Sequence, residues 1–202
     1  WPMAIILGFL NAIGMMTAAT FVLFGQEVLG TSARTFAILG TGGAIGGIVG
    51  SLTAPAVSRR IGGGPALALT MVGGAVSSAA LALTSSWPVA WLAFGLEAGL
   101  GSLWNVITVS LRQAIIPDQL LGRVNSVYRF LGWGMMPIGS LVGGLVVALA
   151  STVTSREVAL RVPFVIACLG NLALLAFGSR RLTTAKIDSA RAAGKAPATV
   201  TA

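Results

Sequence analysis

Hydrophobic residues along the chain form six long stretches, separated by short segments in which glycine, proline, serine and charged residues gather. A helix needs about 20 apolar residues to cross the hydrocarbon core of a bilayer, which is roughly 30 Å thick. The pattern therefore predicts an all-α, polytopic membrane protein whose transmembrane bundle fills residues 1–178. The expected spans are residues 3–25, 35–57, 65–84, 88–111, 124–150 and 161–178.

Prolines mark the ends and the interior of these spans. Pro65, Pro88 and Pro163 stand at or near span beginnings, where a missing backbone N–H costs nothing, and Pro55 lies near a span end. Pro137 alone falls in the middle of a span, so the sequence predicts a helix kink there.

Charged residues make up only 9% of the chain, too few for a surface that is solvated all round, because soluble proteins carry roughly 25%. The net charge of +8 comes from basic residues between the apolar spans, which favours a role in membrane topology over nucleic-acid binding. Arg34, Arg156 and Arg161 fall on one side of the predicted bundle. The other side carries Arg59, Arg60, Arg112, Arg123, Arg129, Arg180, Arg181, Lys186, Arg191 and Lys195.

The more basic side is expected to face the cytoplasm, which makes both chain ends cytoplasmic. Residues 179–202 are rich in alanine, threonine and basic residues without an apolar period, and we expect a disordered basic tail there. The chain enters an apolar segment directly at Trp1 without a signal-peptide pattern, so we expect a fragment whose N-terminal part is missing.

Two of the spans carry glycines at intervals of four residues, a spacing that places them on one helix face and lets another backbone approach closely. Both of these spans meet the cytoplasmic side at an arginine pair, Arg59/Arg60 and Arg123/Arg129, but with opposite chain direction. The matched placement predicts an inverted 3+3 repeat, the building unit of many secondary transporters. The glycines are Gly42, Gly46 and Gly50 in the second span, and Gly139 and Gly143 in the fifth.

Several classes of function are excluded or disfavoured by what the sequence lacks. The chain has no histidine and a single cysteine, Cys168, which excludes His-ligated metals, multi-cysteine metal sites and an intrachain disulfide. No Gly-x-x-x-x-Gly-Lys-Ser/Thr motif occurs, so we expect no ATP-driven step here. An enzyme is the least favoured class, since no nucleophile–base pair is visible, and we expect neither metal nor cofactor.

The stretch from Trp104 in the fourth span to Gly144 in the fifth carries a recognisable series of motifs. In order, they are Trp104-Asn105-Val106, Leu111-Arg112-Gln113, Pro117, Gly122-Arg123-Val124, Pro137-Ile138-Gly139 and Gly143-Gly144. With these motifs the sequence resembles the C-terminal half, spans seven to twelve, of a major facilitator superfamily transporter. It is similar to bacterial macrolide-efflux and enterobactin-exporter-like proteins.

The resemblance implies a half-transporter in a bacterial cell membrane, whose missing N-terminal six-helix half completes the substrate path. It further implies export of amphipathic, drug- or siderophore-like small molecules by alternating access, coupled to proton antiport. Residues 55–64 resemble the superfamily's cytoplasmic-loop motif more weakly, because only Arg60 and Gly62 match its pattern. Arg59 replaces the acidic residue of that pattern, so its charge-relay gating does not carry over, and membrane anchoring explains Arg59 and Arg60.

Glu97 is the outstanding single residue, because it lies about ten residues into the fourth span with no basic residue within a helical turn or two. A carboxyl group near the bilayer centre is costly to ionise, so it should be protonated, paired or exposed to a watery cavity. By resemblance this span lines the central cavity, which suits a proton- or substrate-binding carboxylate. The alternative is a neutral carboxyl that donates a structural hydrogen bond.

Three further residues are candidates for substrate contact. Asn11 shares a helix face with glycines and Met15, which suits a permissive apolar site, although an interhelical hydrogen bond explains it equally well. Trp104 shares a face with Glu97 and could stack on a ligand, with Asn105 at the edge of that face. Asn105 lies nearer the cytoplasmic end, where structural bonding is favoured.

The cytoplasmic turn holds Arg112, Asp118, Arg123 and Arg129. They could form ion pairs that break and remake as two transporter halves rock, which would make the turn a gate. Simple anchoring of the topology is the slightly favoured alternative. Two rivals to proton-coupled export stay open: a proton-coupled importer, and a membrane scaffold or assembly partner that transports nothing.

Overall fold

The computed structural model describes all residues except 1, 117, 180, 186, 188 and 190–202, and it does not describe the side chains of Pro2 and Asp118. The described residues form six α-helices, each long and apolar enough to cross a membrane, which confirms the predicted all-α, six-span class. The helices are α1 (Pro2–Glu27), α2 (Ala33–Ile61), α3 (Gly63–Leu83), α4 (Trp87–Ile115), α5 (Asp118–Ala150) and α6 (Arg156–Ser179).

Most helices extend beyond the apolar stretches, because a helix continues into the polar zone on either side of the hydrocarbon core. Two helices begin well before the predicted spans: α5 begins at Asp118 rather than at 124, and α6 begins at Arg156 rather than at 161. Pro163 therefore lies inside this helix and does not open it, which corrects the sequence expectation. Pro55 and Pro137 also lie inside helices, and α5 is one continuous element through Pro137.

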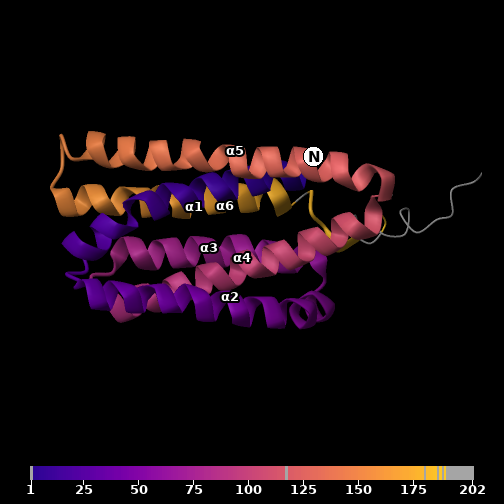
Figure 1. Ribbon diagram of the computed structural model, residues 1–202, viewed down its shortest axis with the longest axis horizontal. Coiled ribbons are helices and arrows are strands. Elements are labelled where there is room, and N and C mark those ends of the chain that lie inside the picture. Colours follow the sequence, from indigo (N-terminus) through magenta and orange to yellow (C-terminus); the bar gives the residue numbers. More distant parts are fainter. Residues whose placement is uncertain (1, 117, 180, 186, 188, 190–202) are drawn as a thin grey trace, which may run out of the picture.

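The helices form two groups of three, with α1, α5 and α6 on one side and α2, α3 and α4 on the other (Figure 1). Within the groups the most extensive packing joins α1 to α5 and α2 to α4, while α3 packs on α6 across the two groups. A single residue, Gly62, separates α2 from α3; its φ of 83° lies in the left-handed region that glycine adopts without strain.

Glycines bring the backbones of α2 and α4 into direct contact. A Cβ atom added to Gly46 would overlap the backbone of Gly95, and one added to Gly50 would overlap the backbone of Gly99. A Cβ on Gly42 would lie 2.7 Å from the Trp91 carbonyl oxygen. We call this contact the α2–α4 seam.

The α1–α5 contact is built in the same way. Gly139 lies against the backbone of Ala12 and Gly143 against the backbone of Met16, with no space for a Cβ at either position. Small residues thus let both helix pairs approach closely, as is common where lipid supplies no hydrophobic driving force between helices.

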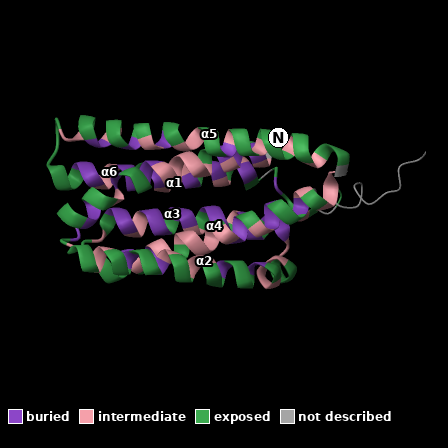
Figure 2. Cartoon of the chain, in the orientation of Figure 1, coloured by how far each residue is buried: buried purple, intermediate pink, exposed green. Residues whose placement is uncertain are grey.

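Burial differs systematically among the helices. Helices α2 and α5 are largely exposed, whereas α3 and α6 have the most buried spans (Figure 2). The apolar residues that α2 and α5 expose include Leu52 and Leu141, which suit contact with lipid or with another apolar surface.

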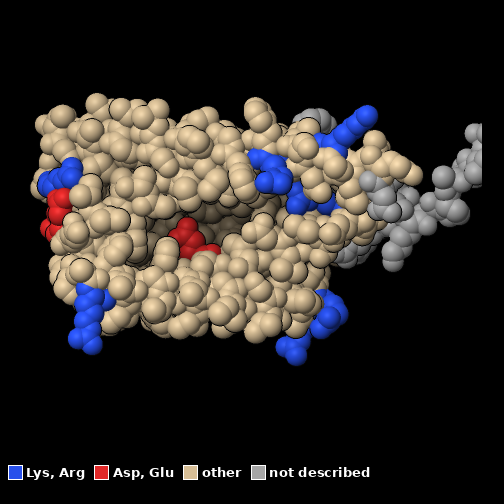
Figure 3. Space-filling model, viewed as in Figure 1, with Lys and Arg blue, Asp and Glu red and all other residues tan. Residues whose placement is uncertain are grey.

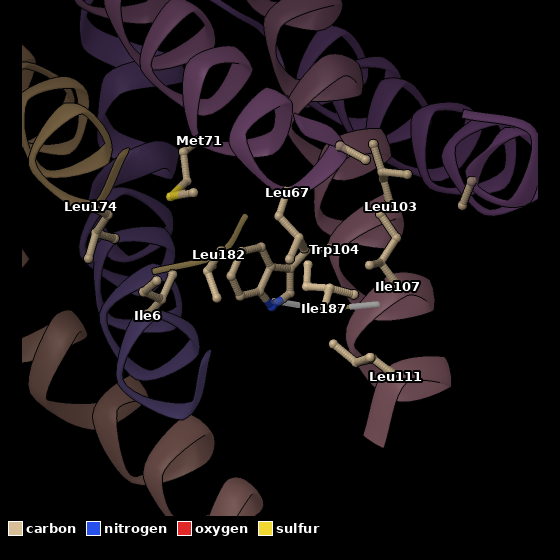
Figure 4. Packing of buried hydrophobic residues seen from close by; sticks show 12 residues of the cluster. Ile6, Leu67, Met71, Leu103, Trp104, Ile107, Leu111, Leu174, Leu182 and Ile187 are labelled. Atoms are coloured by element: carbon tan, nitrogen blue, oxygen red, sulfur yellow. The ribbon is translucent and has the colours of Figure 1, made fainter. Parts of the chain in front are cut away.

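One of two hydrophobic cores lies around Trp104, which is 2% exposed (Figure 4). Leu182 and Ile187, from the predicted tail, are buried in this core beside Leu67 and Leu111. Part of residues 179–202 is therefore folded onto the bundle, and residues 190–202 lie outside the described part of the chain.

Arginine side chains gather at one end of the bundle, where α2 and α4 end and α5 begins; we call it the basic end (Figure 3). The opposite end also carries acidic residues. There Arg156 forms an ion pair with Glu27 at 3.0 Å, and Arg161 one with Glu157 at 2.9 Å. Arg161 also donates hydrogen bonds of 2.8 Å to the carbonyl oxygens of Ala82 and Thr84, at the end of α3.

These two ion pairs predict different effects on stability. Arg161→Ala should lower the free energy of unfolding by about 1.5–3 kcal/mol, because it removes charge-assisted hydrogen bonds to otherwise unpaired helix-end carbonyls. Arg156→Ala is the matched control and should cost no more than about 1 kcal/mol, since that pair is solvent-exposed. Denaturant titration in detergent micelles measures both, and equal losses would contradict this explanation.

Candidate functional site

Glu97 lies between the two groups of helices, at the eleventh residue of α4. It lines two neighbouring cavities, one of about 140 Å³ and one of about 300 Å³. The space-filling view shows acidic atoms inside a hollow in the middle of the molecule, far from both charged ends (Figure 3). A carboxyl group in this position is reached through the cavities and is surrounded by membrane-length helices.

The smaller cavity is lined by three asparagines and one threonine as well as by Glu97, and we call it the amide cavity. Asn11, Asn105 and Asn171 contribute side-chain amides from α1, α4 and α6, and Thr70 contributes a hydroxyl from α3. The Asn11 Nδ2 donates to the Gly132 carbonyl oxygen at 3.1 Å, which ties α1 to α5. The amide cavity is thus built from four helices at the junction of the two groups.

The larger cavity, on the side of Glu97 away from the basic end, is lined by Phe21, Phe36, Phe94 and Phe164, and we call it the aromatic cavity. Phe21 stacks on Phe94 at 5.2 Å between ring centroids and contacts Phe36 at 5.8 Å. The rest of the lining is apolar or small apart from Thr17 and Glu97.

Trp104 lines the amide cavity on the side toward the basic end. Its ring lies in the hydrophobic core, and its indole nitrogen is on the side of Ile187 (Figure 4). That nitrogen is buried and has no hydrogen-bond partner among the described residues. Trp104 is therefore mainly a core residue, and its ring forms part of the cavity wall.

Glu97 has no charged partner within the described part of the chain. No hydrogen bond or ion pair there involves its carboxyl group, and neither cavity is lined by lysine or arginine. The described residues also contain no group of three or more histidine, cysteine, aspartate or glutamate side chains that could hold a metal ion. Among the described residues, Glu97 is thus the one acidic or basic side chain that lines these two cavities.

The arginines of the predicted gate lie away from these cavities, at the basic end. Arg112 stacks on the Tyr128 ring at 4.4 Å and Arg129 on the Trp133 ring at 4.7 Å, whereas Arg123 is exposed. Such cation–π contacts fix arginine side chains without an acidic partner. The side chain of Asp118 is outside the described residues, so the ion-pair cluster stays a prediction; Arg59 and Arg60 are exposed at the end of α2.

Of the residues singled out from the sequence, Asn11, Glu97, Trp104 and Asn105 lie around one cavity. Sequence reasoning missed the phenylalanines of the aromatic cavity, because four residues from four helices leave no spacing signal. Asn171, which was not among the candidates, also lines the amide cavity. The sequence offered one signal that α3 lines the cavity. Thr70 is a polar residue in the middle of an apolar span, and a glycine follows it four residues later.

The cavities predict a pattern of water access. In a Cys168→Ser background, Glu97→Cys and Gly101→Cys should react with a water-soluble maleimide, because a thiol must contact water to ionise. Leu169→Cys is the control, since Leu169 is 61% exposed on the apolar outer face of α6 and should face lipid. Gel-shift labelling in vesicles measures the rates; equal labelling at 97 and 169 would contradict a water-filled cavity.

The chain was compared with known proteins in three ways. The scan against protein-family models, the search of curated proteins and the search of solved structures each find no match.

Proposed function

We propose that this chain is half of a secondary-active membrane transporter of the major facilitator type, working as a proton-coupled exporter of amphipathic small molecules. The observation that carries the proposal is Glu97: a carboxyl group that has no charged partner among the described residues and that faces cavities in the middle of a membrane-length bundle. Intramembrane carboxyl groups are costly and mark proton and substrate pathways in transporters.

The packing of the helices supports the inverted repeat. If α1, α2 and α3 correspond to α4, α5 and α6, the α2–α4 seam maps onto the α1–α5 contact, and both are closed by glycines. The α3–α4 contact likewise maps onto the contact of α6 with α1, and α3–α6 maps onto itself. Inverted repeats of this kind place the substrate site near the bilayer midplane at the repeat interface. With this correspondence Glu97 of α4, which shares a cavity with residues of α1 and α3, would lie at that interface.

The chemistry of coupling follows from the charge balance of the cavities. An ionised carboxylate there is poorly compensated, so either a proton or a cationic group stabilises it. Binding of one then excludes the other, which is the requirement for antiport. Alternating access would expose this one carboxyl group to the two sides of the membrane in turn.

The charge distribution supports an orientation with the basic end in the cytoplasm. A bacterial cell membrane is proposed from the family resemblance alone. In this orientation both chain ends are cytoplasmic. Arg112 and Arg129, held by aromatic rings, would anchor the turn between α4 and α5 at the membrane surface.

Transport needs the second six-helix half that the family resemblance implies, so the test uses the chain joined to that half. In inverted vesicles, an exporter driven by protons accumulates substrate, and a proton uncoupler abolishes the accumulation. Accumulation that survives the uncoupler would refute antiport, uptake in right-side-out vesicles would favour the importer, and no transport in either would favour a scaffold.

A further inference from the structure

The polar atoms that face the amide cavity are mostly hydrogen-bond acceptors. The Asn11 Nδ2 is used in its bond to Gly132, and the Asn171 Nδ2 donates to the Ala167 carbonyl oxygen at 2.9 Å. Each amide therefore keeps its Oδ1 as an acceptor and one of its two N–H groups as a donor. Thr70 donates its hydroxyl proton to the Leu67 carbonyl oxygen at 2.7 Å, which leaves its oxygen as an acceptor too.

Glu97 adds two carboxylate oxygens to this set of acceptors. Fewer atoms donate: the amide nitrogens of Asn11 and Asn171 each keep one N–H, Asn105 offers an amide that both donates and accepts, and the Trp104 nitrogen is buried within the core. A ligand bound here must bring N–H donors, and a positive charge would compensate the carboxylate. An anionic ligand would find no basic side chain in the lining of either cavity.

The lining of the aromatic cavity indicates which chemical group the other end of such a ligand carries. Phe21, Phe94 and Phe36 present ring surfaces at one wall, with Phe164 nearby, and these rings share the cavity with Glu97. An aromatic ring of a ligand packs favourably against such surfaces, and a cation is attracted to the faces of the phenylalanine rings. Glu97 lines both cavities, so a ligand that reaches past its carboxyl group on both sides would occupy the two together.

From this arrangement we infer that the two cavities form one binding site for an organic ammonium ion that carries an aromatic ring. The ammonium N–H groups bind Glu97 and the amide acceptors, and the ring lies in the aromatic cavity. The inference rests on the proposed function, since it names the substrate class for the same site.

Three probes matched in size test the inference: benzylammonium, phenylmethanesulfonate and cyclohexylmethylammonium. The 202-residue chain is placed in phosphatidylcholine nanodiscs, and binding is measured by equilibrium dialysis against empty nanodiscs, which corrects for partition into lipid. Benzylammonium should saturate and phenylmethanesulfonate should not. The saturated-ring cation should bind about 2–12-fold more weakly, because it lacks the aromatic contribution.

Two variants locate the site, each with a control of the same residue type. Glu97→Gln should weaken benzylammonium binding by about 10-fold or more, as expected when a charge-assisted hydrogen bond is lost, while Glu27→Gln at the opposite end changes nothing. Phe21→Leu should remove the preference for the aromatic ring, while Phe130→Leu, on the exposed surface of α5, keeps it. Circular dichroism and size exclusion check that each variant folds.

Binding of the sulfonate as tight as that of benzylammonium would overturn the inference even if Glu97→Gln failed to fold. Unchanged benzylammonium binding in a folded Glu97→Gln variant, or no saturation above empty nanodiscs, would also overturn it. These outcomes are separate from the proposed function: proton antiport of other substrates would leave that proposal standing, and Glu97-dependent cation binding without transport would leave the inference standing.

Discussion

Replacing Glu97 by glutamine should abolish proton-driven accumulation of substrate, while exchange of substrate across the membrane continues at substrate concentrations high enough to offset the weaker binding. The amide keeps the size of the side chain but carries no titratable proton, so movement of substrate no longer depends on movement of a proton. Coupling free energies between two ligands commonly correspond to 5–150-fold changes in affinity, and we expect the effect of pH on substrate affinity, of about that size, to disappear. Accumulation and counterflow in proteoliposomes, measured across a pH series, separate the two activities.

The matched control is Glu27→Gln. Glu27 is also a glutamate in a membrane-length helix, but it is at the end of α1 and pairs with Arg156 outside the cavities. This variant should retain both accumulation and its pH dependence. If Glu97→Gln behaves like Glu27→Gln, Glu97 has no coupling role.

The second large effect is expected at the α2–α4 seam. Gly46→Ala adds one methyl group where the backbone of Gly95 already occupies the space, so the two helices must move apart along the whole contact. Overpacking of this kind typically costs 1–3 kcal/mol, and we expect a loss of about 2–3 kcal/mol because backbone on both sides cannot yield as a flexible side chain would. Unfolding in mixed micelles measures the change.

Gly40→Ala is the control on the same helix. A Cβ at Gly40 meets nothing within 4 Å, so this substitution should be neutral or should stabilise α2 by up to about 1 kcal/mol through its higher helix propensity. A loss at Gly40 equal to the loss at Gly46 would show that glycine acts through general flexibility rather than through close packing.

The number of helices and their approximate positions were predictable, because six apolar stretches of membrane length have few other stable structures. The ends were less predictable: the charged residues Arg156 and Glu157 extend α6 beyond its apolar stretch, which places Pro163 inside the helix. The folding of Leu182 and Ile187 onto the bundle was missed, since two apolar residues in a basic segment show no period.

The candidate site was predictable only in part. Glu97 and Asn11 stand out as polar residues within apolar spans, and helical periodicity places Trp104 on the face of Glu97. Which helices meet across the bundle is decided by tertiary packing, and so the aromatic cavity beside Glu97 was not visible in the sequence. The orientation of the Asn171 amide is set by a hydrogen bond to the Ala167 carbonyl oxygen within α6, which the sequence does not show.

The central claim is that Glu97 carries the proton that drives transport, and proton flux tests it most directly. Proteoliposomes containing the chain and its second half are loaded with substrate and diluted at uniform pH, while a trapped dye records the internal pH. We predict that substrate leaving the vesicles draws protons in and acidifies the interior, and that Glu97→Gln abolishes this acidification although substrate still leaves. Equal acidification by the wild type and by Glu97→Gln would contradict the account.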